Sequence, residues 1–231
     1  MATKKSLELI AGATEQERRA LRLALLPSLS GASPALLDLA STCLKHTFAR
    51  DLIVDGDFQQ VFDLLGSDQV RIRTPLITEL ERHIYGSNEA TRRVLVDAGI
   101  LDAVLRAPVG MNTTDDILSF VVRCVLPELG PSFTQSDGGA SLIPLLKHEE
   151  SRIRASAATA IRNAVESRHG SLQNLANSRI ISILHSTLED DNIRDLWCYM
   201  LPRVAPFLSN RDEIEILFHC LRSVLSLWLT F

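Results

Sequence analysis

The chain has 231 residues, of which 46% are apolar and 23% are charged, a composition that can bury a sizeable core and is not typical of a disordered protein. Its formal net charge is −4, and aromatic residues make up only 5% of the sequence. These values exclude a chain-wide basic surface for nucleic acid and a broad aromatic platform for single strands, so we expect no nucleic-acid partner.

The cysteines and the sequences at the two ends of the chain indicate where in the cell the protein is located. The four cysteines show no CxxC spacing, and we expect them to be buried free thiols of a reducing compartment: Cys43, Cys124, Cys198 and Cys220. Residues 1–19 contain no apolar run of the length that a secretory signal needs, and His219 and Arg222 interrupt the apolar stretch 214–231. The sequence therefore predicts a protein with no membrane span, located in the cytoplasm or, alternatively, in the nucleus.

Two helices are expected at the start of the chain. Residues 1–31 contain an amphipathic segment, 15–26, which ends at Pro27 and is expected to cap the N-terminal end of the fold. The next helix starts at Ser33 and Pro34, because serine is a favoured N-cap and proline is favoured at the first helical position. It is expected to continue towards Phe48.

The stretch 67–106 is the most regular part of the sequence and has the pattern of one complete helical repeat. An amphipathic helix from Val70 to Ile84 is followed by a polar turn, a short helix, a Val-Asp-Ala-Gly corner at 96–99 and a closing apolar helix at 100–105. The corner and the closing helix match the sequence at 54–65, which begins 42 residues earlier.

The remaining chain contains less regular copies of this pattern. Pairs of Ile and Arg mark the register at 72–73, 153–154 and 193–194, with intervals of 81 and 40 residues. A period near 40 is typical of helical repeats, which bury their apolar faces jointly by stacking. We expect a single all-α domain, 1–231, forming a right-handed superhelix of about five repeats: 34–66, 67–108, 109–147, 148–188 and 189–227.

Several local features follow from the same pattern. Pro127 and Pro202 fall inside expected helices, and each should kink its helix. Ser209 and Asp212 are placed as the capping box of the last helix. The arginines that start the repeat helices are expected to pair with preceding acids, Glu150 with Arg154 and Asp190 with Arg194, four residues apart. Trp197 is expected to pack between repeats.

The corner followed by an apolar helix, at 96–105 and again at 54–65, resembles the corner of armadillo repeats. The sequence Ala-Ala-Thr-Ala-Ile-Arg-Asn-Ala-Val-Glu-Ser at 157–167 is similar to the helix of that family that ends in Leu-x-Asn-Leu-Ala. The resemblance, with degenerate HEAT-like repeats, covers roughly residues 34–227. It implies an α solenoid that binds proteins in a concave groove, without enzymatic activity or a cofactor.

Armadillo proteins that bind extended peptides carry a ladder of Asn, often with Trp, on the concave helices. Only Asn163 matches that Asn, and Thr159 stands where Trp would be. The repeat register places Arg82 and Arg203 at the positions equivalent to Asn163, and Tyr199 at one equivalent to Thr159. Aligning the Leu-Pro pairs at 126–127 and 201–202 adds Glu128. We therefore expect a groove for a protein or peptide partner, with acidic segments favoured, that differs from the groove of the importin type. The candidate partner-binding residues are Arg82, Glu128, Asn163, Tyr199 and Arg203; no catalytic residue and no metal ligand is expected.

Two other functions stay open at this point. The dipeptide His148-Glu149 is similar to the motif with which some HEAT-type hydroxylases bind a di-iron centre, which makes a helical-repeat metalloenzyme one alternative. An armadillo-type regulator of a small GTPase is the other. The apolar ending 225–231 suggests either self-association or a piece of a longer solenoid, because terminal repeats normally have a polar outer face.

Overall fold

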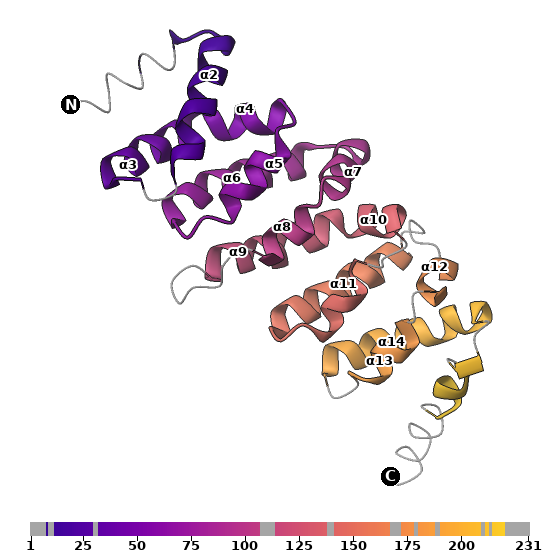
Figure 1. Ribbon diagram of the computed structural model, residues 1–231. Helices are drawn as coiled ribbons and strands as arrows, with labels where there is room; N and C mark the ends of the chain where they lie inside the picture. The colour runs from indigo at the N-terminus through magenta and orange to yellow at the C-terminus, as the bar shows by residue number, and fades with distance from the viewer. Residues whose placement is uncertain are drawn as a thin grey trace. The chain divides into compact units, whose positions relative to one another are not determined.

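The computed structural model describes residue 8 and residues 12–29, 32–106, 114–137, 141–166, 172–177, 180–187, 190–208, 211–212 and 214–219. These ranges form helices and turns with no β-strand, which confirms the predicted all-α class. None of the described helices is both long enough and apolar enough to cross a membrane. The chain divides into two compact units, which are described separately: unit 1 is Met1–Ser87 with Ala98–Phe120, and unit 2 is Asn88–Asp97 with Val121–Phe231 (Figure 1).

Unit 1 is built around one long helix. Its described helices are α2 (Glu15–Leu25), η1 (Leu26–Leu29), α3 (Pro34–Cys43), η2 (Leu44–Phe48), α4 (Ala49–Val54), α5 (Phe58–Leu65), α6 (Val70–Gly86), α8 (Ile100–Arg106) and α9 (Thr114–Phe120). Helix α6 contacts α3, η2, α4, α5 and α9. Its apolar residues at intervals of four, Ile72, Leu76, Leu80 and Ile84, have no exposed surface, so one face of α6 forms the centre of the core.

The first two helices start as the sequence predicts. The side chain of Thr14 accepts a hydrogen bond from the backbone N–H of Glu17, and the Glu17 carboxylate accepts one from the N–H of Thr14 at 2.8 Å, a complete capping box for α2. Ser33 caps α3 with a single bond, its hydroxyl accepting from the backbone N–H of Leu36 at 3.4 Å, and Pro34 takes the first helical position.

Both predicted corners are made by glycines with a left-handed backbone. Gly56 has φ +78° and Gly99 has φ +88°. Each follows a Val-Asp pair directly or after one residue, and each precedes a short apolar helix, α5 or α8. Because residues with a Cβ atom rarely adopt this conformation, glycine permits the sharp change of direction at both corners.

A π-helical turn interrupts the helix that runs from Pro34 to Val54. The backbone N–H of Ala49 donates to the carbonyl of Leu44, five residues earlier, so η2 contains one residue more than an α-helical turn. Helix η3 (Val121–Val125) is a second turn of this kind, in unit 2. The sequence pattern predicts an ordinary helix at both places, because one inserted residue leaves the apolar periodicity almost unchanged.

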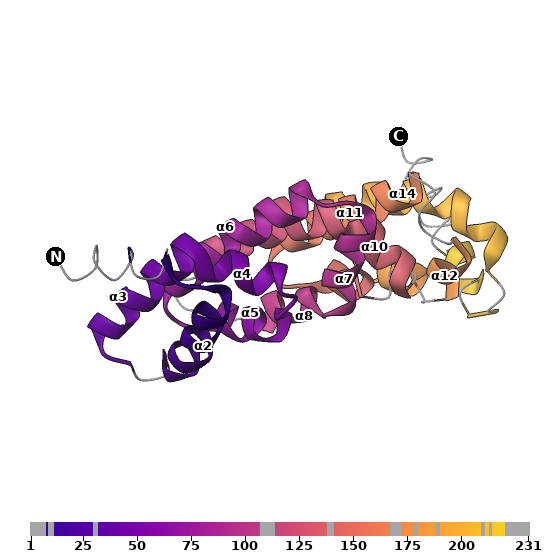
Figure 2. The ribbon, with the colours of Figure 1, turned by 90° about the horizontal axis from the view of Figure 1, so that it is seen from above.

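Unit 2 contains a series of helices in contact. Its described helices are α7 (Glu89–Asp97), η3, α10 (Leu126–Asp137), η4 (Ile143–Lys147), α11 (Ser151–Glu166), α12 (Leu172–Asn177), α13 (Ile180–His185), α14 (Asp191–Val204) and η5 (Ala205–Phe207). Helix α10 contacts α7 and α11, and α11 contacts α14 (Figure 2). Trp197 on α14 is 2% exposed, so its predicted burial is confirmed. Pro202 lies inside α14, whereas Pro127 lies at the start of α10, directly after the π turn.

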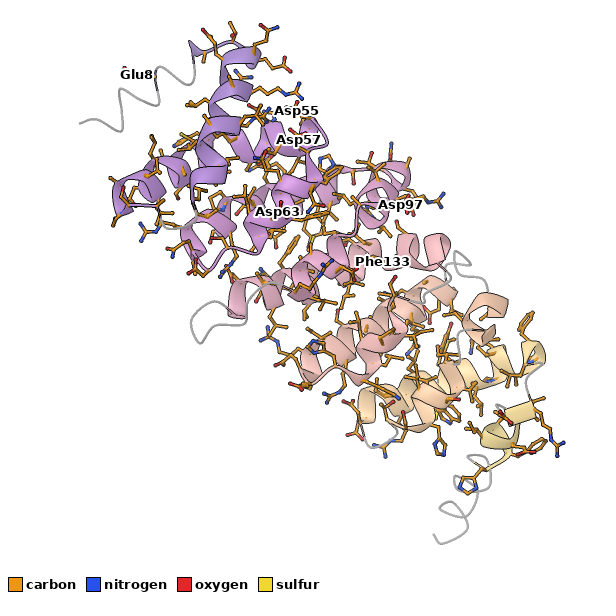
Figure 3. The ribbon with its side chains drawn as sticks, in the orientation of Figure 1. Glu8, Asp55, Asp57, Asp63, Asp97 and Phe133 are labelled. Atoms are coloured by element: carbon orange, nitrogen blue, oxygen red, sulfur yellow. The ribbon has the colours of Figure 1, made fainter. Side chains whose placement is uncertain are left out.

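Arginine–aspartate pairs join helices within each unit. In unit 1, Arg22 on α2 is almost fully buried and bonds Asp55 at the end of α4. Figure 3 labels Asp55 among the side chains of this unit. Arg73 on α6 has no exposed surface and donates to the carbonyl of Ser67 at 2.6 Å and to the carboxylate of Asp116 on α9 at 3.2 Å. These pairs hold successive helices together through charge-assisted hydrogen bonds.

The equivalent arginine of unit 2 makes the same kind of contact. Arg154, which is 81 residues after Arg73, donates to the carbonyl of His148, six residues earlier, and to the carboxylate of Asp190 at 2.8 Å. Ser67 is likewise six residues before Arg73. Both arginines therefore bond a backbone carbonyl six residues earlier and an aspartate further along the chain.

The expected pairing of these arginines with acids four residues earlier is wrong. Arg154 bonds Asp190 rather than Glu150, because Asp190 immediately precedes α14 and lies within reach of the guanidinium. Arg194 pairs with Asp191, three residues before it, rather than with Asp190.

The prediction that the cysteines are buried holds for only two of the three that the structure describes. Cys43 and Cys124 are free and buried, but Cys198 is free and exposed. It follows the buried Trp197 on α14, and one helical step of about 100° turns it away from the core face. Cys220, the proposed cap residue Ser209 and the apolar ending 225–231 lie outside the described residues.

Candidate functional site

The five predicted binding residues lie on long helices of both units. Arg82 is on α6 in unit 1, whereas Glu128 is on α10, Asn163 is on α11, and Tyr199 and Arg203 are on α14 in unit 2. The residues of each unit are therefore described separately.

In unit 2, the guanidinium groups of two arginines lie over the ring of Tyr199. The guanidinium carbon of Arg203 lies 3.8 Å from the centre of the Tyr199 ring, and that of Arg162 lies 4.7 Å from it. Arg203 also donates from Nη1 to the backbone carbonyl of Tyr199 at 2.7 Å. We call these three residues the arginine–tyrosine stack. Such contacts combine cation–π attraction with reduced side-chain freedom.

The stack leaves hydrogen-bonding capacity at the surface. Arg203 is exposed and has no carboxylate partner among the described residues, whereas Arg162 also bonds Glu166 on its own helix at 3.0 Å. A guanidinium stacked on a ring keeps its N–H edge available for a carboxylate. The sequence register found Tyr199 and Arg203 but missed Arg162, which comes from the neighbouring helix and directly precedes Asn163.

The two other predicted residues of unit 2 differ in their surroundings. Asn163 is exposed on α11. Glu128 forms an ion pair with Arg92 of α7 at 3.2 Å, and Arg92 also donates to the backbone carbonyl of Glu128 at 3.3 Å. Glu128 therefore joins α10 to α7, in addition to any contact it makes with a partner.

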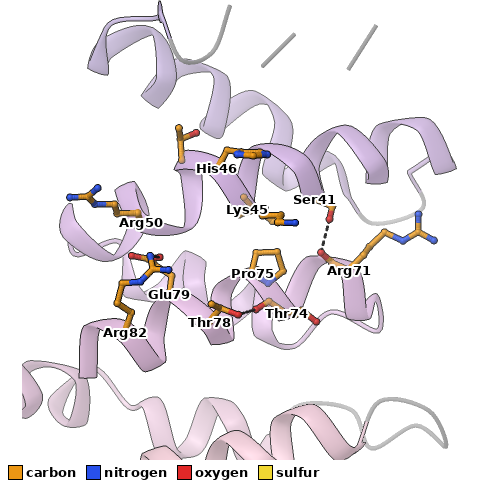
Figure 4. Close-up of a pocket in the computed structure, with 12 residues that line it drawn as sticks. Ser41, Lys45, His46, Arg50, Arg71, Thr74, Pro75, Thr78, Glu79 and Arg82 are labelled. Carbon is orange, nitrogen blue, oxygen red and sulfur yellow. Dashed lines mark hydrogen bonds and ion pairs between the residues drawn. The ribbon is translucent and has the colours of Figure 1, made fainter. Parts of the chain in front are cut away.

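In unit 1, Arg82 lines a pocket between the helix that carries η2 and helix α6. The volume of this pocket is about 500 Å³. Figure 4 shows Arg71 at one end of the pocket, Arg50 and Arg82 towards the other, and Lys45 near Pro75 between them. We call this pocket the basic groove. Arg82 itself is exposed and pairs with Glu79 on its own helix.

The basic groove carries strong positive charge for a protein of net charge −4. Four arginine or lysine side chains line it, Lys45, Arg50, Arg71 and Arg82, against the single carboxylate of Glu79, which gives a formal charge of +3 with His46 neutral. Arg71 bonds the carboxylate of Asp38 at 2.5 Å. Within the described part of the chain, no ion pair or hydrogen bond engages the side chains of Lys45, His46 or Arg50.

The His148-Glu149 dipeptide has a local structural role. The Nδ1 atom of His148 accepts a hydrogen bond from the backbone N–H of Glu150 at 3.1 Å, directly before α11 begins. No group of three or more His, Cys, Asp or Glu side chains in the described ranges is arranged to hold a metal ion.

No protein-family model matches the sequence, and comparison with curated proteins found no match. Among solved structures, an engineered protein from the Northeast Structural Genomics Consortium is similar over 90% of this chain and 98% of its own, with 12% sequence identity and a TM-score of 0.44. A similarity at that level carries no argument about fold or function.

Proposed function

We propose that this protein is a non-enzymatic interaction scaffold with an armadillo-like solenoid fold, which binds a segment of a partner protein through the arginine–tyrosine stack. The stack carries the proposal because it combines the residue types that dominate binding hot spots with an accessible, preorganised cation. A carboxylate of the partner would bond the N–H edge of Arg203, and an apolar part of the partner would pack beside Tyr199.

The repeated architecture supports the solenoid part of the proposal. Gly56 and Gly99 form similar corners. Arg73 and Arg154, which are 81 residues apart, each bond a backbone carbonyl six residues earlier. Helices that recur with such a spacing bury their apolar faces jointly and leave a continuous side free for binding.

The test is an affinity capture with matched variants. Arg203→Gln removes the exposed cation of the stack, whereas Arg194→Gln removes an exposed cation from the start of the same helix and serves as the control. Tyr199→Leu removes the ring but keeps an apolar side chain. A hot spot of this kind contributes about 1–2 kcal/mol or more, which corresponds to about a tenfold loss of affinity.

Partners that the wild type and Arg194→Gln retain, and that Arg203→Gln and Tyr199→Leu both lose, would support the proposal. Equal recovery by all four proteins would refute the assignment of the site to the arginine–tyrosine stack.

A further inference from the structure

We propose that the basic groove of unit 1 is a second binding site, which takes an extended acidic peptide segment of about five residues with Asp or Glu at alternating positions. This proposal rests on residues 41–50 and 71–82 and does not depend on the arginine–tyrosine stack.

The π turn creates one side of this groove. Lys45 and Arg50 are five residues apart, a spacing that turns their directions by about 140° in a regular α-helix. The extra residue of η2 lies between them and changes this angle, and both side chains line the groove. π turns of this kind are frequent at functional sites.

Helix α6 forms the other side. Arg71, Thr78 and Arg82 line the groove at intervals of seven and four residues, which place them along one helix face. The eleven steps from Arg71 to Arg82 correspond to about 16 Å of helix. An extended peptide advances about 3.3 Å per residue, so about five residues span this length.

The charges favour side-chain carboxylates as the groups that the groove recognises. An extended segment of five residues presents its first, third and fifth side chains to one side. The four cations of the groove outnumber the carboxylates that pair with them, those of Asp38 and Glu79, by two, so carboxylates on that side of the peptide meet uncompensated positive charge. Among the described residues, the side chains of Lys45 and Arg50 form no ion pair. Binding a carboxylate there therefore need not break an existing one.

The neutral groups of the groove favour a peptide over nucleic acid. The hydroxyls of the groove already donate to backbone carbonyls: Ser41 to Arg71, Thr47 to Cys43, Thr74 to Val70 and Thr78 to Thr74. The four cationic side chains and the ring N–H of His46 are therefore the donors that a ligand can use. No Phe, Tyr or Trp lines the groove, although exposed rings are what single-stranded nucleic acids stack on.

The first experiment measures binding of a fluorescein-labelled peptide of alternating Glu and Ser, about 15 residues long, to the full chain at low salt. Lys45→Gln/Arg50→Gln removes two exposed cations of the groove, and Arg19→Gln/Arg106→Gln removes two exposed cations that do not line it. We expect the groove variant to weaken binding about fivefold or more and the control pair to weaken it less than twofold. Raising the salt concentration should weaken wild-type binding, since screening acts on exposed charges.

The second experiment locates the peptide. A carbodiimide joins a peptide carboxylate to a nearby lysine amine, and mass spectrometry identifies the lysine. We expect a cross-link at Lys45 in preference to Lys147, an exposed lysine of unit 2, and we expect it to persist in Tyr199→Leu/Arg203→Gln.

Three outcomes would overturn the assignment. They are equal weakening by the two double variants, cross-links that favour Lys147, and failure of the peptide to bind under conditions where a single-stranded RNA of similar length binds. Loss of peptide binding only in Tyr199→Leu/Arg203→Gln would support the stack and refute the groove, so the two proposals can fail separately.

Discussion

Replacing Asp116 by Asn should destabilise unit 1 far more than replacing Asp38 by Asn. Both aspartates pair with an arginine of α6, so the two substitutions remove the same charge from similar ion pairs. Arg73, the partner of Asp116, has no exposed side-chain surface, and Asp116 is 25% exposed. Arg71 and Asp38 are 47% and 65% exposed.

The difference in burial sets the expected magnitudes. Removing one partner of a fully buried ion pair costs about 3–5 kcal/mol, because it leaves an uncompensated charge in the interior. Asp116 is partly exposed, and asparagine can still accept from both Arg73 and the N–H of Ile117, so we expect about 2–3 kcal/mol. An exposed pair such as Arg71–Asp38 contributes less than about 1 kcal/mol.

Thermal unfolding followed by circular dichroism measures both effects. With about 2–4 °C per kcal/mol for a chain of this size, Asp116→Asn should lower the Tm by about 5–10 °C and Asp38→Asn by less than about 3 °C. Equal Tm changes for the two aspartate variants would refute this reasoning.

Three further predictions concern the corners, the first helix cap and the thiols. Gly99→Val should lower the free energy of unfolding by about 1–2 kcal/mol or more, and Gly99→Asn by less, because asparagine tolerates a positive φ; equal losses in urea unfolding would contradict this. The backbone N–H of Thr14, followed by its hydroxyl, lowers the pKa of Glu17 by hydrogen bonding. This stabilisation should be fully present above about pH 4.3 and be lost as pH falls through the lowered pKa, so the pH dependence of unfolding between about pH 5 and 3 should be shallower in Glu17→Gln. A maleimide should label Cys198 before Cys43 in the native protein, since burial raises the pKa of the Cys43 thiol, and peptide mapping that shows equal rates would contradict the structure.

The sequence by itself determined the helical class and most helix positions. Apolar residues at intervals of four made α6 predictable, because a helix must bury its apolar stripe. Ser33 with Pro34, and the glycines of the two corners, marked boundaries through local backbone chemistry that needs no distant contact. The Ile-Arg pairs likewise pointed to Arg73 and Arg154, which make the same kind of contact with a carbonyl six residues earlier.

Tertiary structure decided which side chains meet. Arg154 bonds Asp190 and Arg162 stacks on Tyr199 because neighbouring helices bring distant residues together, and local spacing contains no information about that approach. The π turn at η2 also escaped prediction, although it places Lys45 and Arg50 in one groove, because a single inserted residue alters side-chain direction while leaving the apolar pattern nearly intact. The apolar pattern and the local caps therefore determine where helices form, whereas the chemistry of the helix surfaces depends on small rotations that only the packed structure specifies.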